Sequence, residues 1–372
     1  MIEKYYDGAI EQVAAGLGTV EKNYLLVRYS GQFSVENLND TKQLEKNEDI
    51  FVQVHEFETG EITCAYEPYL TMICDGFRRY MTGTFEEFME TCDVYYLHRP
   101  VLLGYFNQDN TGREEIILLD EVAYEQERML AALERMLCAI ADRHPVLFVL
   151  NRFQLASKST MQLTARFLKC ENCNIGLVLG VSDIQAMPEF LVPDWEMLYE
   201  TLDDGSKIYH IGNSGRKKEE TIDDEKYVDY GSEKVYRKLQ NMVEFLDFDQ
   251  AAYYLETIER KIKFDNLLVD DAARFRMWLL FVKVSILRQD IPKALEICED
   301  LEKIHLAGKE EECAYEQDYL IATAYMYQGK LKEALEMAGE TYRIAGKMSD
   351  DYRMFLSELL EAKIQMSGWY NI

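Results

Sequence analysis

Two uninterrupted apolar runs, residues 146–150 and 175–181, constrain the fold of this chain more than any other feature. Neither run alternates with polar residues, which is typical of strands that are buried on both faces in a helix-covered parallel sheet. Residues 161–170 between them have amphipathic helical spacing, and Ser159 and Thr160 are suited to cap that helix. Because this crossover is long enough to join parallel neighbours, we predict a strand, loop, helix and strand here.

The rest of the first half also mixes helix and strand patterns. The predicted elements are a helix over 2–17, a strand over 24–29, a strand over 50–57, a helix opening near 66–70, a long helix over 121–140, a helical segment over 195–199 and a short strand over 207–212. The aromatic-rich residues 85–106 show no periodicity that would assign them to a helix or a strand. Residues 213–229 are polar and charged, so we interpret them as a domain boundary.

The second half, from residue 231 onward, has only helical patterns. Three segments repeat a turn, an apolar residue and an alanine, with Ala252, Ala294 and Ala334 spaced by 42 and 40 residues. Small alanines let the two helices of a hairpin approach closely, and Gly329 tolerates the turn between them. We therefore expect about three helical hairpins.

Composition excludes several classes of protein. The chain has 372 residues, of which 48% are hydrophobic and 29% charged, as in folded proteins with more than one domain. A formal charge of -27 argues against nucleic acid or an anionic membrane as the main partner. The sequence shows neither a secretory signal nor about 20 consecutive apolar residues. We expect a cytoplasmic protein with no membrane contact, whose eight cysteines are reduced thiols.

Two turns occupy the places where a nucleotide-binding ATPase holds phosphate and magnesium. The strand over 24–29 leads into Ser30, Gly31 and Ser34, but residues 30–37 contain one glycine and no lysine to neutralise phosphate. The strand over 146–150 leads into Asn151 and Arg152, an amide and a cation where Mg²⁺ needs carboxylates.

These turns and strands resemble a degenerate P-loop ATPase of the AAA+ and STAND (signal-transduction ATPase) type, followed by helices similar to tetratricopeptide repeats (TPR). The resemblance implies an α/β plus all-α fold: a mainly parallel sheet sandwiched by helices over 1–215, a linker over 216–230, and a TPR-like solenoid over 231–372. It also implies that Asp183 lies where related ATPases carry a sensor residue. Similar modules occur in bacterial signalling proteins, joined to DNA-binding or diguanylate cyclase effectors, and neither effector signature occurs in this sequence.

The first functional hypothesis is a non-catalytic signalling or regulatory protein, in which a pseudo-ATPase core accompanies helical repeats that bind a protein partner. It requires no cofactor. The acidic total favours a basic or neutral partner. One alternative is a divergent STAND-type ATPase switch that binds nucleotide, ATP with Mg²⁺, through the turn with Ser30, Gly31 and Ser34, with Arg152 or Asp183 as sensors. The other is a small-molecule sensor that serves a diguanylate cyclase or a transcription effector. Neither the oligomeric state nor the identity of the partner can be predicted.

Other constellations have simpler interpretations than catalysis. Cys170 and Cys173 have the spacing of half a zinc site, but no second pair follows, so we expect a short loop and no metal site. Ser157 to Thr160 are interpreted as a helix cap and not as a nucleophile. His55, Glu56 and Glu58 end a strand, where we expect a polar cap and not a working site. We predict no catalytic residue.

The sequence contains 25 tyrosines, including several adjacent pairs. Tyrosine can bury its ring and keep its hydroxyl in water, so packing explains most of them. Three tyrosines in the best copy of the repeat, Tyr319, Tyr325 and Tyr327, are predicted to contact the protein partner.

Overall fold

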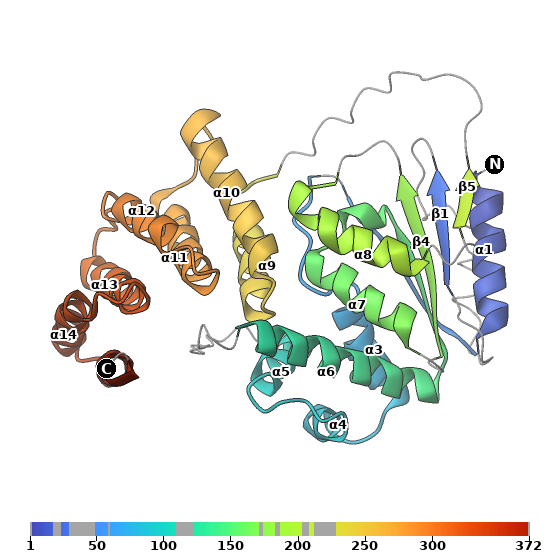
Figure 1. The fold of residues 1–372 in the computed structure, drawn as a ribbon, viewed down its shortest axis with the longest axis horizontal. Helices are drawn as coiled ribbons and strands as arrows, with labels where there is room; N and C mark the ends of the chain where they lie inside the picture. The colour runs from blue at the N-terminus through green and yellow to red at the C-terminus, as the bar shows by residue number, and fades with distance from the viewer. Residues whose placement is uncertain are drawn as a thin grey trace. The chain divides into compact units, whose positions relative to one another are not determined.

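The computed structural model divides into two compact units (Figure 1). The structure describes residues 2–17, 24–29, 49–58, 60–108, 122–170, 174–182, 187–202, 208–211 and 228–370. Residues 1–116, 123–228 and 244–247 form the first unit, which we call the α/β unit. Residues 117–122, 229–243 and 248–372 form the second, which we call the helical unit.

The α/β unit is built on a five-stranded parallel sheet. Its strands are β1 (Tyr24–Tyr29), β2 (Phe51–Glu56), β3 (Val146–Asn151), β4 (Ile175–Ser182) and β5 (Ile208–Ile211). They lie in the order β2-β3-β4-β1-β5, and every neighbouring pair is parallel. The predicted mixture of a parallel α/β sheet and helices is therefore confirmed. The two apolar runs are adjacent strands, fully buried along their length.

Helices cover both faces of the sheet, which explains why β3 does not alternate with polar residues. Leu147 and Val149 pack with α1 (Ile2–Gly16) on one face. Phe148, which points to the other face, lies 4.7 Å from the ring of Tyr69 in α3 (Tyr69–Tyr80). Both faces of β3 are therefore in the hydrophobic core.

A glycine in β4 allows α1 to approach the sheet closely. A Cβ atom at Gly176 would lie 2.7 Å from Val13 Cγ1 and 3.0 Å from Leu147 Cδ1. No ordinary carbon contact is that short, so a side chain at this position would push the helix or the neighbouring strand away. Gly176 thus sets the packing distance of α1.

The crossover between β3 and β4 begins earlier than the sequence indicated. Helix α7 (Lys158–Lys169) is capped by Ser157, whose hydroxyl accepts a 3.2 Å hydrogen bond from the Thr160 amide. The cap predicted within residues 157–160 is therefore confirmed at Ser157, whereas Ser159 and Thr160, which the helical spacing indicated, lie inside the first turn. The serine before a lysine is the better cap here because its extended backbone aims the hydroxyl at the free amides.

The aromatic-rich segment that the sequence did not assign forms two short helices. These are α4 (Phe85–Thr91) and α5 (Arg99–Asn107), followed by the long α6 (Val122–Arg143). Thr84 and Glu87 form a capping box at the start of α4, in which each side chain bonds the other's backbone amide. Helix α8 (Val192–Leu202) packs against α7.

The helical unit contains seven helices within its described residues. They are α9 (Glu233–Glu244), α10 (Phe248–Phe264), α11 (Asp271–Leu287), α12 (Ile291–Leu301), α13 (Glu310–Tyr327), α14 (Leu331–Met348) and α15 (Asp351–Tyr370). No helix among the described residues is both long and apolar enough to cross a bilayer.

Three helix connections share one geometry. The turns before α10, α12 and α14 each hold a residue with positive φ two positions before the helix starts: Leu246 at 66°, Gln289 at 62° and Gly329 at 79°. These positions are 43 and 40 residues apart. The fourth residue of each following helix is a fully buried alanine: Ala251, Ala294 and Ala334. Ala252, which the sequence repeat indicates, lies one residue after the equivalent Ala251, because neither Leu246 nor Gln289 marks its turn as a glycine does.

The buried alanines lie where neighbouring helices meet. Ala334 and Ala338 of α14 form one cluster with Ala322 of α13 and with Leu360 and Ile364 of α15. Small side chains at this crossing let the helix backbones approach. The hairpin packing expected for this segment is therefore present between α13 and α14.

Candidate functional site

The carboxyl ends of β1 and β3 lie close together at the end of the sheet where its parallel strands finish, which we call the sheet edge. The Tyr29 hydroxyl donates a 2.7 Å hydrogen bond to Asn151 Oδ1, and both residues are buried. Strand β4 lies between their strands, so the tyrosine side chain reaches past it. Open parallel sheets place ligands at this edge, which makes it the first candidate site.

An ion pair closes the same edge beside β2. Arg152 Nε lies 3.4 Å from Glu56 Oε1, and both side chains are largely shielded from solvent. The backbone of Arg152 has a φ of 53°, in the left-handed region that residues other than glycine rarely adopt. Such strain costs about 1–3 kcal/mol and persists only where the surroundings enforce it. The tight turn after β3 thus directs the guanidinium toward the end of β2.

A third contact ties the turn after β3 to the end of β4. Gln154 Nε2 donates a 3.1 Å hydrogen bond to the Ser182 carbonyl, and the Ser182 amide donates back to Gln154 Oε1 at 3.4 Å. Gln154 is buried. Its amide side chain therefore forms hydrogen bonds with the backbone carbonyl and amide groups of Ser182, as a residue of a neighbouring strand would.

The chemistry of this edge differs from that of a magnesium site. The end of β3 offers a neutral amide and a guanidinium, and the carboxylate of Glu56 is already paired with that guanidinium. Burial raises the pKa of Tyr29 to about 12, against the opposing effects of Arg152 and Asn151, so the phenol stays protonated near neutral pH. Mg²⁺ prefers carboxylates beside phosphate oxygens. Within the described part of the chain, the polar side chains at this edge bond one another.

Only some of the predicted nucleotide-site residues can be placed. Asn151 and Arg152 lie at the edge and contact Tyr29 and Glu56, respectively. The predicted residues Ser30, Gly31, Ser34 and Asp183 lie outside the described residues, as does Cys173 of the cysteine pair. Glu56, predicted to be a polar strand end, pairs with Arg152. His55 packs its ring 4.5 Å from Phe57.

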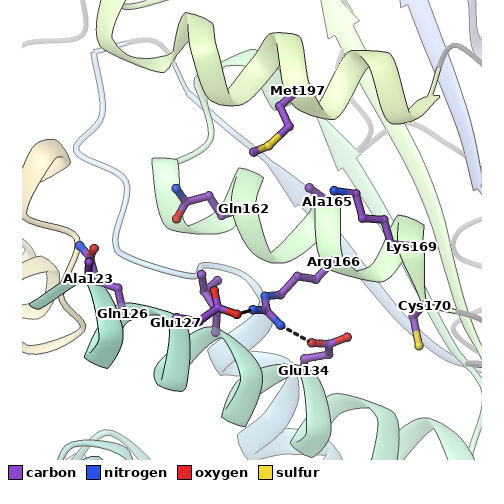
Figure 2. Close-up of a pocket in the computed structure, with 11 residues that line it drawn as sticks. Ala123, Gln126, Glu127, Glu134, Gln162, Ala165, Arg166, Lys169, Cys170 and Met197 are labelled. Carbon is purple, nitrogen blue, oxygen red and sulfur yellow. Dashed lines mark hydrogen bonds and ion pairs between the residues drawn. The ribbon is translucent and has the colours of Figure 1, made fainter. Parts of the chain in front are cut away.

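A second candidate is a groove within the α/β unit, lined by α6, α7 and α8, which we call the polar groove (Figure 2). It has a volume of about 590 Å³, large enough for a small ligand. Arg166 pairs with Glu127 and, at 2.8 Å, with Glu134, as the dashed lines in Figure 2 show. Burial lowers the pKa of Arg166 and raises that of Glu134. With Lys169, the lining carries two cationic and two anionic side chains. This charge balance favours the binding of neither an anion nor a cation.

A third candidate lies within the helical unit, and we call it the helical groove. It has a volume of about 540 Å³ and is lined by α11, the loop before α13, the start of α13 and Arg353 of α15. Phe275, Leu279 and Leu306 supply apolar surface. The charged lining consists of Arg276, Lys309 and Arg353 against Glu312 and Glu316. An apolar floor with nearly balanced charges suits an amphipathic segment of neutral charge.

Most of these charges are held in place by neighbours within the unit. Arg276 pairs with Glu233 at 2.8 Å and lies 5.0 Å from the ring of Tyr236. Arg353 pairs with Glu316 at 2.9 Å and with Asp350. The groove is therefore pre-organised, which reduces the entropy lost when a ligand binds.

The three predicted partner-binding tyrosines lie outside this groove. Tyr319 and Tyr325 are half-buried and pack against the alanine cluster of α13 and α14. Tyr319 also stacks on Tyr315, and Lys330 lies 5.4 Å from the Tyr325 ring. Tyr327, also half-buried, ends α13. Their described contacts are those of packing residues, and their role in partner binding stays a prediction.

Sequence reasoning missed Tyr29 and Gln154 as members of the edge network. One signal was available, since both are polar and adjoin the ends of strands that read as buried. The residues of the helical groove carried no such signal, because they come from separate helices.

No protein-family model matches the chain, and none of the curated proteins compared with it is significantly similar.

Proposed function

We propose that this chain is a non-catalytic signalling or regulatory protein, in which an α/β unit related to P-loop ATPases accompanies TPR-like helices that bind a protein partner. The observation that carries the proposal is the network at the sheet edge. Where an ATPase would present acids to magnesium, Asn151 binds Tyr29 and Arg152 binds Glu56. The described residues at this edge fit neither a magnesium ion nor its water, so no catalytic step is assigned to them.

The arrangement also supports the kinship itself. The resemblance requires that the turn after the first strand and the end of the 146–151 strand face one ligand, although they are distant in sequence. The direct contact between Tyr29 and Asn151 is consistent with that requirement. The buried, parallel β3 and β4 joined by α7 support it as well.

A phosphate-release assay on the full chain tests the absence of catalysis. We expect no turnover of Mg·ATP above the buffer rate, because neither described end of β1 or β3 supplies an ammonium or an unpaired carboxylate. Turnover that is lost in Asn151→Ala but retained in Gln126→Ala, a polar-groove change, would contradict the proposal.

The second candidate function is an ATP-binding switch without hydrolysis. The meeting of β1 and β3 favours it, because a nucleotide bound after β1 would lie beside Asn151. Equilibrium binding of nucleotide separates the two functions, since the switch must hold ATP and the regulator need not.

The protein-binding part of the proposal rests on the helical groove. Its apolar floor of Phe275, Leu279 and Leu306 is bordered by charged side chains that nearly balance. Among the basic and neutral partners expected for an acidic chain, this lining favours a neutral, amphipathic peptide or helix.

A matched pair of variants tests this part. Ala272 is exposed in the groove, so Ala272→Arg fills the groove without disturbing the core. Gln328→Arg adds the same side chain at an exposed position between α13 and α14, outside the groove. We expect partners captured from the native host by the wild-type chain and by Gln328→Arg to be lost with Ala272→Arg. Equal capture by all three proteins would exclude the groove.

A further inference from the structure

Helix α15 carries an apolar stripe on the side that faces away from its own unit. Tyr352, Phe355 and Met366 are 52%, 57% and 59% exposed. Leu359 is half-buried and Ala362 is exposed between them. We call these five residues the α15 stripe. The opposite side of the helix is used for packing, where Leu360 and Ile364 join the alanine cluster.

The spacing of the α15 stripe is that of a coiled-coil seam. Its members follow one another at intervals of three, four, three and four residues, the alternation of heptad positions a and d. An exposed apolar stripe promotes association with another apolar surface. A seam of this kind fits another helix, not an extended peptide.

Charged residues beside the α15 stripe indicate which helix would pair with it. Glu358 precedes Leu359 at a g position, and Lys363 follows Ala362 at an e position. In a parallel pair of helices, a g residue lies opposite the e residue five positions further along the partner. Glu358 of one copy would therefore meet Lys363 of the other, twice per dimer. An antiparallel pair would instead bring the two copies of Glu358 together.

A carboxylate partner would stabilise the ammonium group of Lys363. Its side chain is half-buried, and burial lowers the pKa of its ammonium. No carboxylate of the described residues forms an ion pair with it. The second copy would supply that carboxylate without any change in the helix.

We propose that α15 is a homodimerisation helix, which pairs in parallel with α15 of a second copy through the α15 stripe and two Glu358–Lys363 ion pairs. The stripe is self-complementary, as a two-fold interface must be. This inference is independent of the proposed function, because it holds whether or not the α/β unit binds nucleotide.

Sedimentation velocity of the full chain over a concentration series tests the stripe. We expect a reversible dimer whose dissociation constant rises at least about tenfold in Phe355→Glu, since buried aromatic anchors dominate such interfaces. Phe264→Glu is the control, because Phe264 is 76% exposed and ends α10, outside the stripe. A monomer at every concentration, or a dimer that Phe355→Glu leaves unchanged, would overturn the proposal.

Charge reversal tests the partner and the direction of the helices. Glu358→Lys places two ammonium groups opposite each other in the parallel pair and should weaken the dimer, as should Lys363→Glu. The double variant E358K/K363E restores both ion pairs and should recover most of the affinity. If Glu358→Lys alone strengthens the dimer, the pair is antiparallel and the proposed arrangement is wrong. Circular dichroism of each variant confirms that the helices remain folded.

Discussion

The Tyr29 hydroxyl donates its hydrogen bond to Asn151 across an intervening strand, joining the ends of β1 and β3 at 2.7 Å. This contact places a phenol and an amide at the end of the sheet where open parallel sheets bind their ligands. Because the two groups bond each other directly, the contribution of this contact to stability can be measured without added nucleotide.

Removing either partner should destabilise the α/β unit. Tyr29→Phe deletes the donor to a fully buried acceptor, and we expect a loss of about 1–3 kcal/mol in the free energy of unfolding. Urea unfolding of Tyr29→Phe, Asn151→Ala and the double variant completes a thermodynamic cycle. We expect a coupling of about 1 kcal/mol or more. Strictly additive losses would show that the bond contributes nothing.

Two glycines of the α/β unit should respond oppositely to alanine. Gly176→Ala should destabilise by about 1–3 kcal/mol, because its methyl would overlap Val13 and Leu147. Gly8→Ala on α1 meets nothing within 4 Å and should stabilise by about 0.5–1 kcal/mol through helix propensity. Urea unfolding of both variants provides the measurement. A harmless Gly176→Ala would contradict the close approach of α1.

Sequence patterns predicted the elements whose burial is uniform. Residues 146–150 and 175–181 read as strands covered on both faces because no polar residue interrupts them, and both are buried along their length. The strand order could not be predicted, because a buried strand pairs equally well with several neighbours. For the same reason, nothing local indicated that Arg152 would pair with Glu56 and not with phosphate. The capping box of Thr84 and Glu87 is readable from the sequence and would have identified α4.

The shared turn geometry predicts how glycine acts in the helical unit. Gly329 has a φ of 79° and an unobstructed Cβ direction, so Gly329→Ala should cost about 1–2 kcal/mol through backbone strain alone. Gly346, inside α14, also has open space around it, and Gly346→Ala should stabilise. Thermal unfolding of the two variants provides the comparison. Equal effects would mean that the turn tolerates a side chain without strain.

Acidification should destabilise the α/β unit through His98. Burial, and then Arg128, lowers the pKa of His98 to about 4 from 6.5, and these effects outweigh that of Glu125, whose buried carboxylate lies 3.0 Å from His98 Nε2. Between about pH 6.5 and pH 4, His98 is protonated in the unfolded chain but neutral in the folded chain. Stability therefore falls with pH until about pH 4, by on the order of 3 kcal/mol.

The variant His98→Gln isolates this effect. Urea unfolding between pH 7 and pH 4 should show a smaller loss for His98→Gln than for the wild-type chain. His305→Gln is the control, because it makes the same substitution at an exposed position of the helical unit. An identical profile for all three proteins would show that His98 titrates normally.

Calorimetric titration of the full chain with Mg·ATP tests the central claim most directly. If the sheet edge is a closed network of Tyr29, Asn151, Arg152 and Glu56, no saturable heat should appear at micromolar protein, and nucleotide should leave the unfolding temperature unchanged. Saturable micromolar binding that requires magnesium and is abolished by Asn151→Ala would contradict the account.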